Sequence, residues 1–327
     1  MANNLRVSTQ NGATSMRYVE ATIAMTAASL LAITLHLHAQ APQQDTLVWA
    51  PVPKTPNAWI APNKPHTKLV DLLAAHKGQA SWRQPIVRDA LLVADYVQMA
   101  PGEKTRRQFQ PDNPIWWIVQ SGEVRFTIEG VDSFVATKGF LVQVPYRNVF
   151  QFEAAGTAPA LLLEVKVADS PTMYPADETP APVPGMEFVK VRISGKAKYS
   201  DTVRPFLDFN SAVAAGRRVA GAFVSDPRAF ANVIRGLPQE DNPNDKGHFH
   251  EVSSEFWFIL EGTINYKIAD LPIFDAVQGD VVFVPKQMWH RAHHGGTGYS
   301  TRLAMNGYPQ LLHNFQRTEE LRSTKDR

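Results

Sequence analysis

The feature of this sequence that most constrains its fold is an internal repeat. When the second half of the 327-residue chain is shifted back by 140 positions, Gly262 aligns with Gly122 and Pro285 aligns with Pro145. The segment EFWFILEGTINYKI then lies over IWWIVQSGEVRFTI without a gap. Turn residues and alternating apolar residues therefore repeat together, which is typical of strands joined by tight turns. We expect two copies of one β-rich unit.

Short apolar runs between glycine and proline turns predict an all-β fold in both copies. The 24 prolines and 19 glycines agree with a chain that has many turns. Helical spacing with a glycine stop occurs at KLVDLLAAHKG, Lys68 to Gly78. The predicted order is a proline-rich arm with this short helix (41–85), an N-terminal β unit (86–170), a proline-rich linker (171–185), a C-terminal β unit (186–315) and a polar tail (316–327).

The first 40 residues are predicted to be a signal peptide. The uncharged run ATIAMTAASLLAITL follows Arg17 and precedes the small residues Ala39 and Ala41. The run is shorter than the roughly 20 apolar residues of a membrane span. We expect export to the periplasm or the medium, with no stable membrane anchor once the peptide is removed. An uncleaved anchor or a buried helix is the alternative that the sequence leaves open.

Composition excludes several classes of site. The chain has no cysteine, so disulfides, zinc–thiolate sites and cysteine nucleophiles are ruled out. The formal net charge is only +2, and no basic stripe stands out, so no nucleic-acid partner is expected. The sequence does not determine whether the chain forms a homo-oligomer.

The second copy carries a set of metal-ligating residue types. His248 and His250 are two positions apart, so on a strand they point to the same side. Glu255 begins the next apolar run, and His290 follows the turn at Pro285. Three imidazoles and one carboxylate suit one divalent transition ion, and Fe, Mn, Cu, Ni and Zn all remain candidates. These four residues are the predicted metal ligands.

The spacing H-x-H, four residues, Glu, six residues, Gly, followed by G-x5-P-x4-H, resembles the two signature motifs of the cupin superfamily. The duplication resembles the bicupins, which include oxalate enzymes, quercetin dioxygenase and gentisate-type dioxygenases. The resemblance covers about 86–165 and 226–310 and implies two tandem double-stranded β-helix (jelly-roll) barrels. It also implies that His248, His250, Glu255 and His290 hold the metal. Gln287 and His294 depart from the glycine and the asparagine usual in the second motif.

The first copy lacks every one of these ligands. Its aligned residues are Gln108, Gln110, Ile115 and Phe150, of which the last two offer no donor atom. We therefore expect a metal-free barrel that acts as a scaffold. A small organic pocket that uses Gln108, Gln110 and Trp117 is the alternative.

Strand alternation predicts the surroundings of the metal. If Glu255 points inward, so does Trp257, as an aromatic platform or as plain core, while Phe256 and Phe258 point outward and pack between the barrels. Other catalytic candidates are Lys286 and His294; their neighbours Arg291 and His293 are expected in a solvated loop.

Two classes of function follow from the resemblance. The first is an enzyme, favoured as an oxidoreductase of the dioxygenase type that acts on a small oxygen-rich or aromatic metabolite; a manganese decarboxylase and a sugar isomerase would use the same four ligands. The second is a non-catalytic, metal-stabilised protein that binds a sugar or another small molecule. In both classes the partner is a small molecule.

Overall fold

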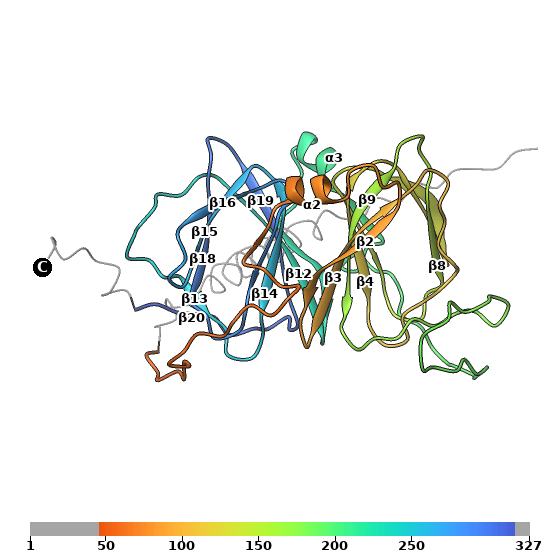
Figure 1. The fold of residues 1–327 in the computed structure, drawn as a ribbon, viewed down its shortest axis with the longest axis horizontal. Coiled ribbons are helices and arrows are strands. Elements are labelled where there is room, and N and C mark those ends of the chain that lie inside the picture. The colour runs from red at the N-terminus through yellow and green to blue at the C-terminus, as the bar shows by residue number, and fades with distance from the viewer. Residues whose placement is uncertain (1–45, 318–327) are drawn as a thin grey trace, which may run out of the picture. The chain divides into compact units, whose positions relative to one another are not determined.

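The computed structural model describes residues 46–317, whose regular secondary structure consists of strands and two short helices. The all-β prediction is confirmed, and the strands gather into two barrels (Figure 1). The predicted signal peptide and the last ten residues of the tail lie outside the described residues. Within residues 46–317, no helix has the length and apolar character needed to cross a membrane.

The N-terminal barrel consists of a six-stranded and a three-stranded antiparallel sheet. The first has the order β10-β7-β4-β9-β3-β2 and the second the order β6-β5-β8. The strands are β2 (Trp82–Arg88), β3 (Leu92–Met99), β4 (Ile115–Ser121), β5 (Val124–Ile128), β6 (Val131–Ala136), β7 (Phe140–Val144), β8 (Phe150–Ala154), β9 (Ala160–Val167) and β10 (Phe206–Asp208).

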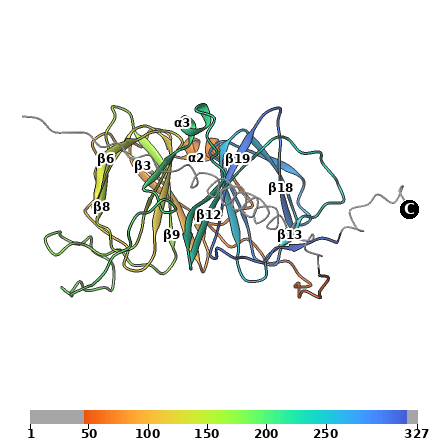
Figure 2. The same ribbon diagram turned by 180° about the vertical axis from the view of Figure 1, so that it is seen from behind.

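The C-terminal barrel repeats this plan. Its sheets have the orders β1-β17-β14-β19-β12-β11 and β16-β15-β18-β13-β20. The strands are β1 (His66–Thr67), β11 (Gly221–Asp226), β12 (Ala229–Gly236), β13 (His248–Phe249), β14 (Glu255–Glu261), β15 (Thr263–Ile268), β16 (Phe274–Val277), β17 (Val281–Val284), β18 (His290–His294), β19 (Ser300–Asn306) and β20 (Asn314–Phe315). Figure 2 shows β12, β18 and β19 of this barrel from behind.

The two repeats exchange their first strands. β1 precedes the N-terminal barrel in the chain but pairs with β17 of the C-terminal barrel. β10 lies 140 positions later and pairs with β7 of the N-terminal barrel. Each exchanged strand leads into a short helix, α2 (Leu69–Ala75) or α3 (Phe209–Ala214), near the junction of the barrels (Figure 1). The repeat is therefore longer than the part that the sequence landmarks reveal.

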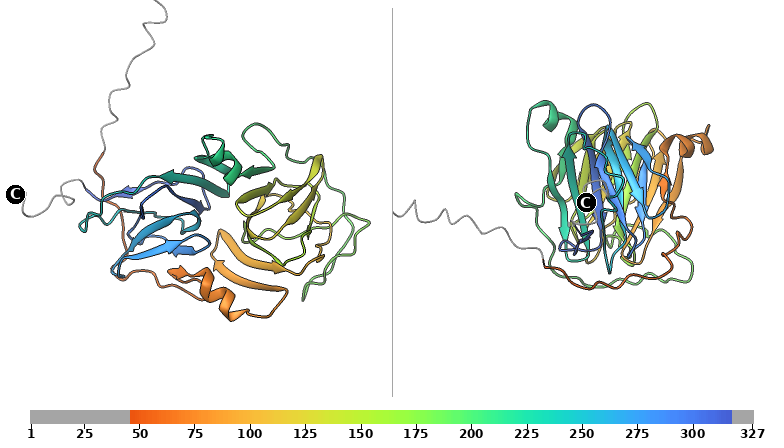
Figure 3. Two further views of the ribbon diagram at one scale, coloured as in Figure 1. Left: turned by 90° about the horizontal axis from the view of Figure 1, so that it is seen from above. Right: turned by 90° about the vertical axis from the view of Figure 1, so that its left-hand side faces the viewer.

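Alternation along β14 separates two cores. Phe256 and Phe258 belong to a buried cluster that also contains Tyr96 and Trp116 of the N-terminal barrel, so their predicted packing between the barrels is confirmed. Trp257 belongs instead to the inner core of the C-terminal barrel. Seen from above, the strands of each half surround their own interior (Figure 3). The inside of the C-terminal barrel is where the candidate site lies.

Candidate metal centre

Backbone pairing brings the predicted ligands together from three places in the chain. His248 on β13 is the direct antiparallel partner of His290 on β18. His250 follows β13, and Glu255 is the first residue of β14. Gly247 permits the close approach of β13 to β18, because its φ is +77° and a Cβ there would lie 2.0 Å from the carbonyl oxygen of His290.

The four side chains converge on one point. His248, His250, Glu255 and His290 each offer one ligand atom, and these atoms all lie within 4.8 Å of one another. Nε2 of His250 is 3.0 Å from Oε2 of Glu255, and Nε2 of His290 is 3.4 Å from the same oxygen. The prediction that these four residues meet is confirmed.

Hydrogen bonds to backbone carbonyls orient two of the imidazoles. Nδ1 of His250 lies 2.9 Å from the carbonyl oxygen of Leu312, and Nδ1 of His290 lies 2.8 Å from that of Met288. An Nδ1–H that donates to a carbonyl leaves the Nε2 lone pair directed at the centre, the usual arrangement of metal-ligating histidines. Nε2 of His248 is buried without a hydrogen-bond partner, and Nε2 of His290 is buried with only its 3.4 Å contact to Glu255. These buried acceptors and the mixed donor set fit a divalent transition ion.

Electrostatics favour deprotonated ligands at two of the positions. Burial, with a contribution from His290, lowers the pKa of His248 to about 2, so this imidazole is neutral. Burial alone would raise the pKa of Glu255, but hydrogen bonds with His250 and His290 hold it below its usual range. The same contact with Glu255 outweighs burial at His250 and raises its pKa. The contact between His250 and Glu255 is therefore one that a bound metal would replace.

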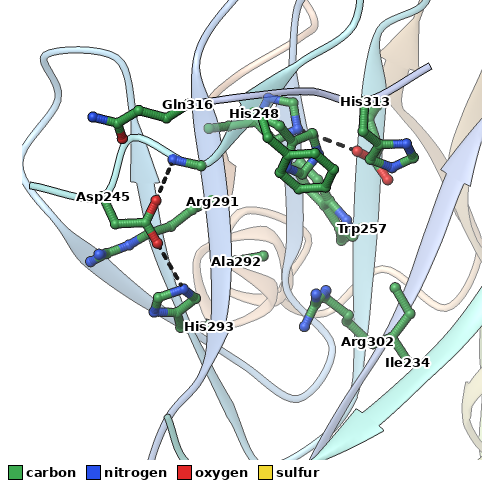
Figure 4. A pocket seen from close by; sticks show the side chains of 14 residues that line it. Ile234, Asp245, His248, Trp257, Arg291, Ala292, His293, Arg302, His313 and Gln316 are labelled. Atoms are coloured by element: carbon green, nitrogen blue, oxygen red, sulfur yellow. Dashed lines mark hydrogen bonds and ion pairs between the residues drawn. The ribbon is translucent and has the colours of Figure 1, made fainter. Parts of the chain in front are cut away.

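A cavity of about 340 Å³ gives access to this cluster. The ligands His248, Glu255 and His290 line it, together with Trp257, whose ring centroid is 5.4 Å from that of His290. His313 also lines the cavity, with its ring centroid 4.5 Å from that of His250 (Figure 4). Trp257 is thus an aromatic wall of the cavity as well as part of the inner core.

Neither of the other two catalytic candidates predicted from the sequence, Lys286 and His294, lines this cavity. Lys286 is exposed and does not line it. His294 is buried, with Nδ1 2.8 Å from Oγ of Ser300, and burial lowers its pKa to about 4. The expectation of a solvated loop at Arg291 and His293 is wrong, because both residues belong to β18 and line the cavity.

Comparison with known proteins agrees with this fold. The cupin domain family matches residues 95–166 and 238–305, one stretch in each barrel. Both halves of this chain are cupin domains. The chain is therefore a bicupin, with a cluster of three histidines and one glutamate in its C-terminal half. A search of curated proteins finds no significant match.

Solved bicupin structures share this fold at low sequence identity. A salicylate 1,2-dioxygenase from Pseudaminobacter salicylatoxidans is 12% identical, covers 91% of this chain and 95% of its own, and has a TM-score of 0.55. A mutant of that enzyme in complex with gentisate covers 95% and 99% at 12% identity, with a TM-score of 0.56. An oxalate decarboxylase variant from B. subtilis is 13% identical, covers 80% and 81%, and has a TM-score of 0.47.

The N-terminal cupin fills the positions of the metal ligands differently. Phe150 packs in its inner core with Trp117, at 5.1 Å between ring centroids, and Ile115 belongs to the same core. The side chain of Gln110 is buried and accepts a hydrogen bond from Oγ of Ser170. The Trp117 ring is fully buried, and its Nε1 donates to Glu164. Trp117 is thus a core residue of this cupin.

Proposed function

We propose that this bicupin is a metal-dependent oxidoreductase of the dioxygenase type that acts on a small oxygen-rich or aromatic metabolite. One observation carries the proposal: three imidazoles and a carboxylate converge within 4.8 Å beside a cavity of about 340 Å³. A volume of several hundred cubic ångströms suits a small organic ligand. The salicylate 1,2-dioxygenase, which has the same fold and is named for a reaction on an aromatic compound, supports the proposal.

The residues of the chain have separate roles in this proposal. His248, His250, Glu255 and His290 would hold the ion, and four protein ligands leave open positions on an ion that prefers five or six. Such an ion supplies the redox or Lewis-acid chemistry that protein side chains lack. Trp257 offers an apolar face against which a flat substrate can pack. The carbonyls of Leu312 and Met288 keep His250 and His290 in position, so the site is preorganised.

Metal content gives the first test. The purified protein, prepared without chelator, should contain about one transition ion per chain by elemental analysis. His250→Ala and Glu255→Gln should each lose most of that ion, since removal of one ligand weakens binding at least about tenfold. His76→Ala is the matched control, because His76 stacks on Trp82 and is not part of the cluster. Full metal content in both ligand variants would contradict the assignment.

Oxygen consumption then tests the reaction class. The metal-loaded protein should consume dioxygen with a member of a panel of catechols, flavonols and small diacids, and His250→Ala should abolish the activity. Release of carbon dioxide or sugar isomerisation without oxygen uptake would contradict the dioxygenase assignment while leaving the metal centre in place.

A further inference from the structure

Two buried polar groups inside the C-terminal cupin have no partner. Nε and Nη1 of Arg302 are shielded from solvent, and no described group accepts a hydrogen bond from them. The hydroxyl of Tyr266 is likewise buried without a hydrogen-bond partner, and the whole Tyr266 side chain is buried. Buried donors without acceptors cost free energy, so such groups are rare unless a ligand completes them.

Strand register directs Arg302 into the barrel. On β19, Arg302 lies two positions before Ala304, which belongs to the inner core with Trp257. Its backbone partners are Ile234 on β12 and Ile259 on β14. Arg302 lines the same cavity as the metal ligands, and Figure 4 shows its guanidinium directed into that cavity. Tyr266 does not line the cavity itself but packs beside Trp257, which does, with 5.2 Å between ring centroids.

The N-terminal cupin provides an internal comparison. The residues aligned with Arg302 and Tyr266 at the offset of 140 are Leu162 and Phe126. Both are buried in the inner core of that barrel, so an apolar pair suffices for the fold at these positions. The polar pair therefore occurs in the cupin that has the ligand cluster and is replaced by an apolar pair in the cupin that lacks it. This difference indicates a role in binding rather than in folding.

Charge in the cavity is not balanced by the protein. The carboxylate of Glu255 is already engaged by His250 and His290. Arg291, the other arginine that lines the cavity, pairs with Asp241. A divalent ion held by Glu255 leaves one positive charge and the guanidinium of Arg302 adds a second, while the carboxylate of Asp245, which also lines the cavity beside His293, cancels one of the two. An anion that enters the cavity would reduce this excess charge and accept hydrogen bonds from Arg302.

We propose that Arg302 binds a carboxylate group of the substrate, so that the substrate is a small carboxylic acid. A planar guanidinium matches the geometry of a carboxylate. The carboxylate would be held by Arg302 inside the cavity, with the rest of the molecule against Trp257, which lines the same cavity. This inference rests on the proposed function, because it assigns the substrate class of the same site.

Calorimetric titrations of the protein with benzoate and, separately, with benzamide test the inference. The two probes share shape, but only benzoate carries a negative charge. The metal-loaded wild-type protein should bind benzoate at least about tenfold more tightly than benzamide. Arg302→Gln should weaken benzoate binding by about ten- to a hundredfold and leave benzamide binding unchanged.

Arg235→Gln is the matched control for loss of a positive charge. Arg235 lies on β12 next to Ile234, but its side chain pairs with Glu261 and does not line the cavity. Its benzoate affinity should stay within about twofold of the wild type, since screening weakens the effect of a distant, already paired charge. Elemental analysis of the same samples should show unchanged metal content in Arg302→Gln.

Three results would overturn the inference. The first is a wild-type protein that binds benzoate no more tightly than benzamide, or that binds neither compound. Another is an Arg302→Gln variant with wild-type benzoate affinity, and a third is an equal loss in Arg235→Gln. If Arg302→Gln fails to fold, the wild-type comparison of the two probes still decides. A wild-type protein without metal would refute the proposed function instead, and the same titrations on that protein would test the anion site separately.

Discussion

At the scale of single residues, the geometry of the candidate metal centre depends on a glycine. Gly247 precedes His248 and has a left-handed φ of +77°. In Gly247→Ala, the new Cβ would lie 2.0 Å from the carbonyl oxygen of His290, so β13 must move away from β18. We expect metal affinity to fall at least about tenfold, and stability to fall by about 2–4 kcal/mol from strain and lost pairing. Metal competition assays and urea unfolding measure the two effects.

Gly216→Ala separates the close contact from backbone strain. Gly216 also has a left-handed φ, +66°, but nothing lies within 4 Å of a Cβ built there. This variant should lose only about 1–2 kcal/mol and should keep the metal affinity of the wild type. Equal loss of metal in both variants would show that the contact with His290 has no special role.

The sequence predicts the ligands of this site better than the rest of its lining. His248, His250, Glu255 and His290 follow from motif spacing, because ligands to one ion must be contributed at fixed strand positions. Arg302 does not follow, since a single arginine in a strand is usually a surface residue. The usable signal is the alignment of the repeats, in which Arg302 replaces Leu162 of an inner core.

At the scale of elements, β1 and α2 are attached to the C-terminal cupin through Asp280. Oδ2 of Asp280 lies 2.7 Å from Nε2 of His66 on β1, and Oδ1 accepts a hydrogen bond from the backbone N–H of Leu69 at the start of α2. The backbone N–H of Val277 donates to the same carboxylate. Burial alone would raise the pKa of Asp280, but the hydrogen bonds from His66 and the backbone hold it below its usual value.

This linkage predicts a dependence of stability on pH. Because the folded pKa of Asp280 lies below its unfolded value of about 3.8, its contribution is fully present above that pH and is lost as pH falls through the folded pKa. Asp280→Asn should lower the free energy of unfolding by about 2–4 kcal/mol at neutral pH. The difference from wild type should shrink below about pH 4. Urea unfolding across a pH series, monitored by circular dichroism, measures it.

Asp275→Asn serves as the control for this prediction. Asp275 is exposed on β16, and its carboxylate accepts one hydrogen bond, from Asn265. The substitution should change stability by no more than about 0.5 kcal/mol at any pH in the series. A pH-independent difference between wild type and Asp280→Asn would contradict the role given to the carboxylate.

The exchange of β1 and β10 could not be foreseen from local pattern. The segments HTKLVDLLAA and FLDFNSAVAA occupy equivalent places in the two repeats but share few residues. Strand periodicity specifies which face of a strand is buried and not which barrel supplies its partner. The helix in 68–78 was recognisable because an apolar 3.6-residue period and a glycine stop are local signals.

At the scale of the whole molecule, the exchanged strands and the shared core make each cupin incomplete without the other. Tyr96 of the N-terminal cupin donates a hydrogen bond to the carbonyl of Gly279, and Gln143 donates to that of Phe223 at 2.6 Å. The cluster that contains Trp116 and Phe256 buries apolar surface from both cupins. We infer that the two cupins unfold as one cooperative unit.

This cooperativity predicts that metal bound in the C-terminal cupin stabilises the N-terminal cupin, because a ligand of the folded state stabilises everything that unfolds with its site. Hydrogen exchange followed by mass spectrometry reports β5 and β15 separately. Added metal should raise protection equally in both strands. A substitution in the other cupin gives a second readout. Phe126→Ala, in the inner core of the N-terminal cupin, should lower the free energy of unfolding by about 3–5 kcal/mol. It should also lower the temperature at which metal is released by as much as it lowers the unfolding temperature of β5. Metal-dependent protection confined to β15 would show instead that the cupins unfold independently. The exchanged strands would then not couple the unfolding of the two domains.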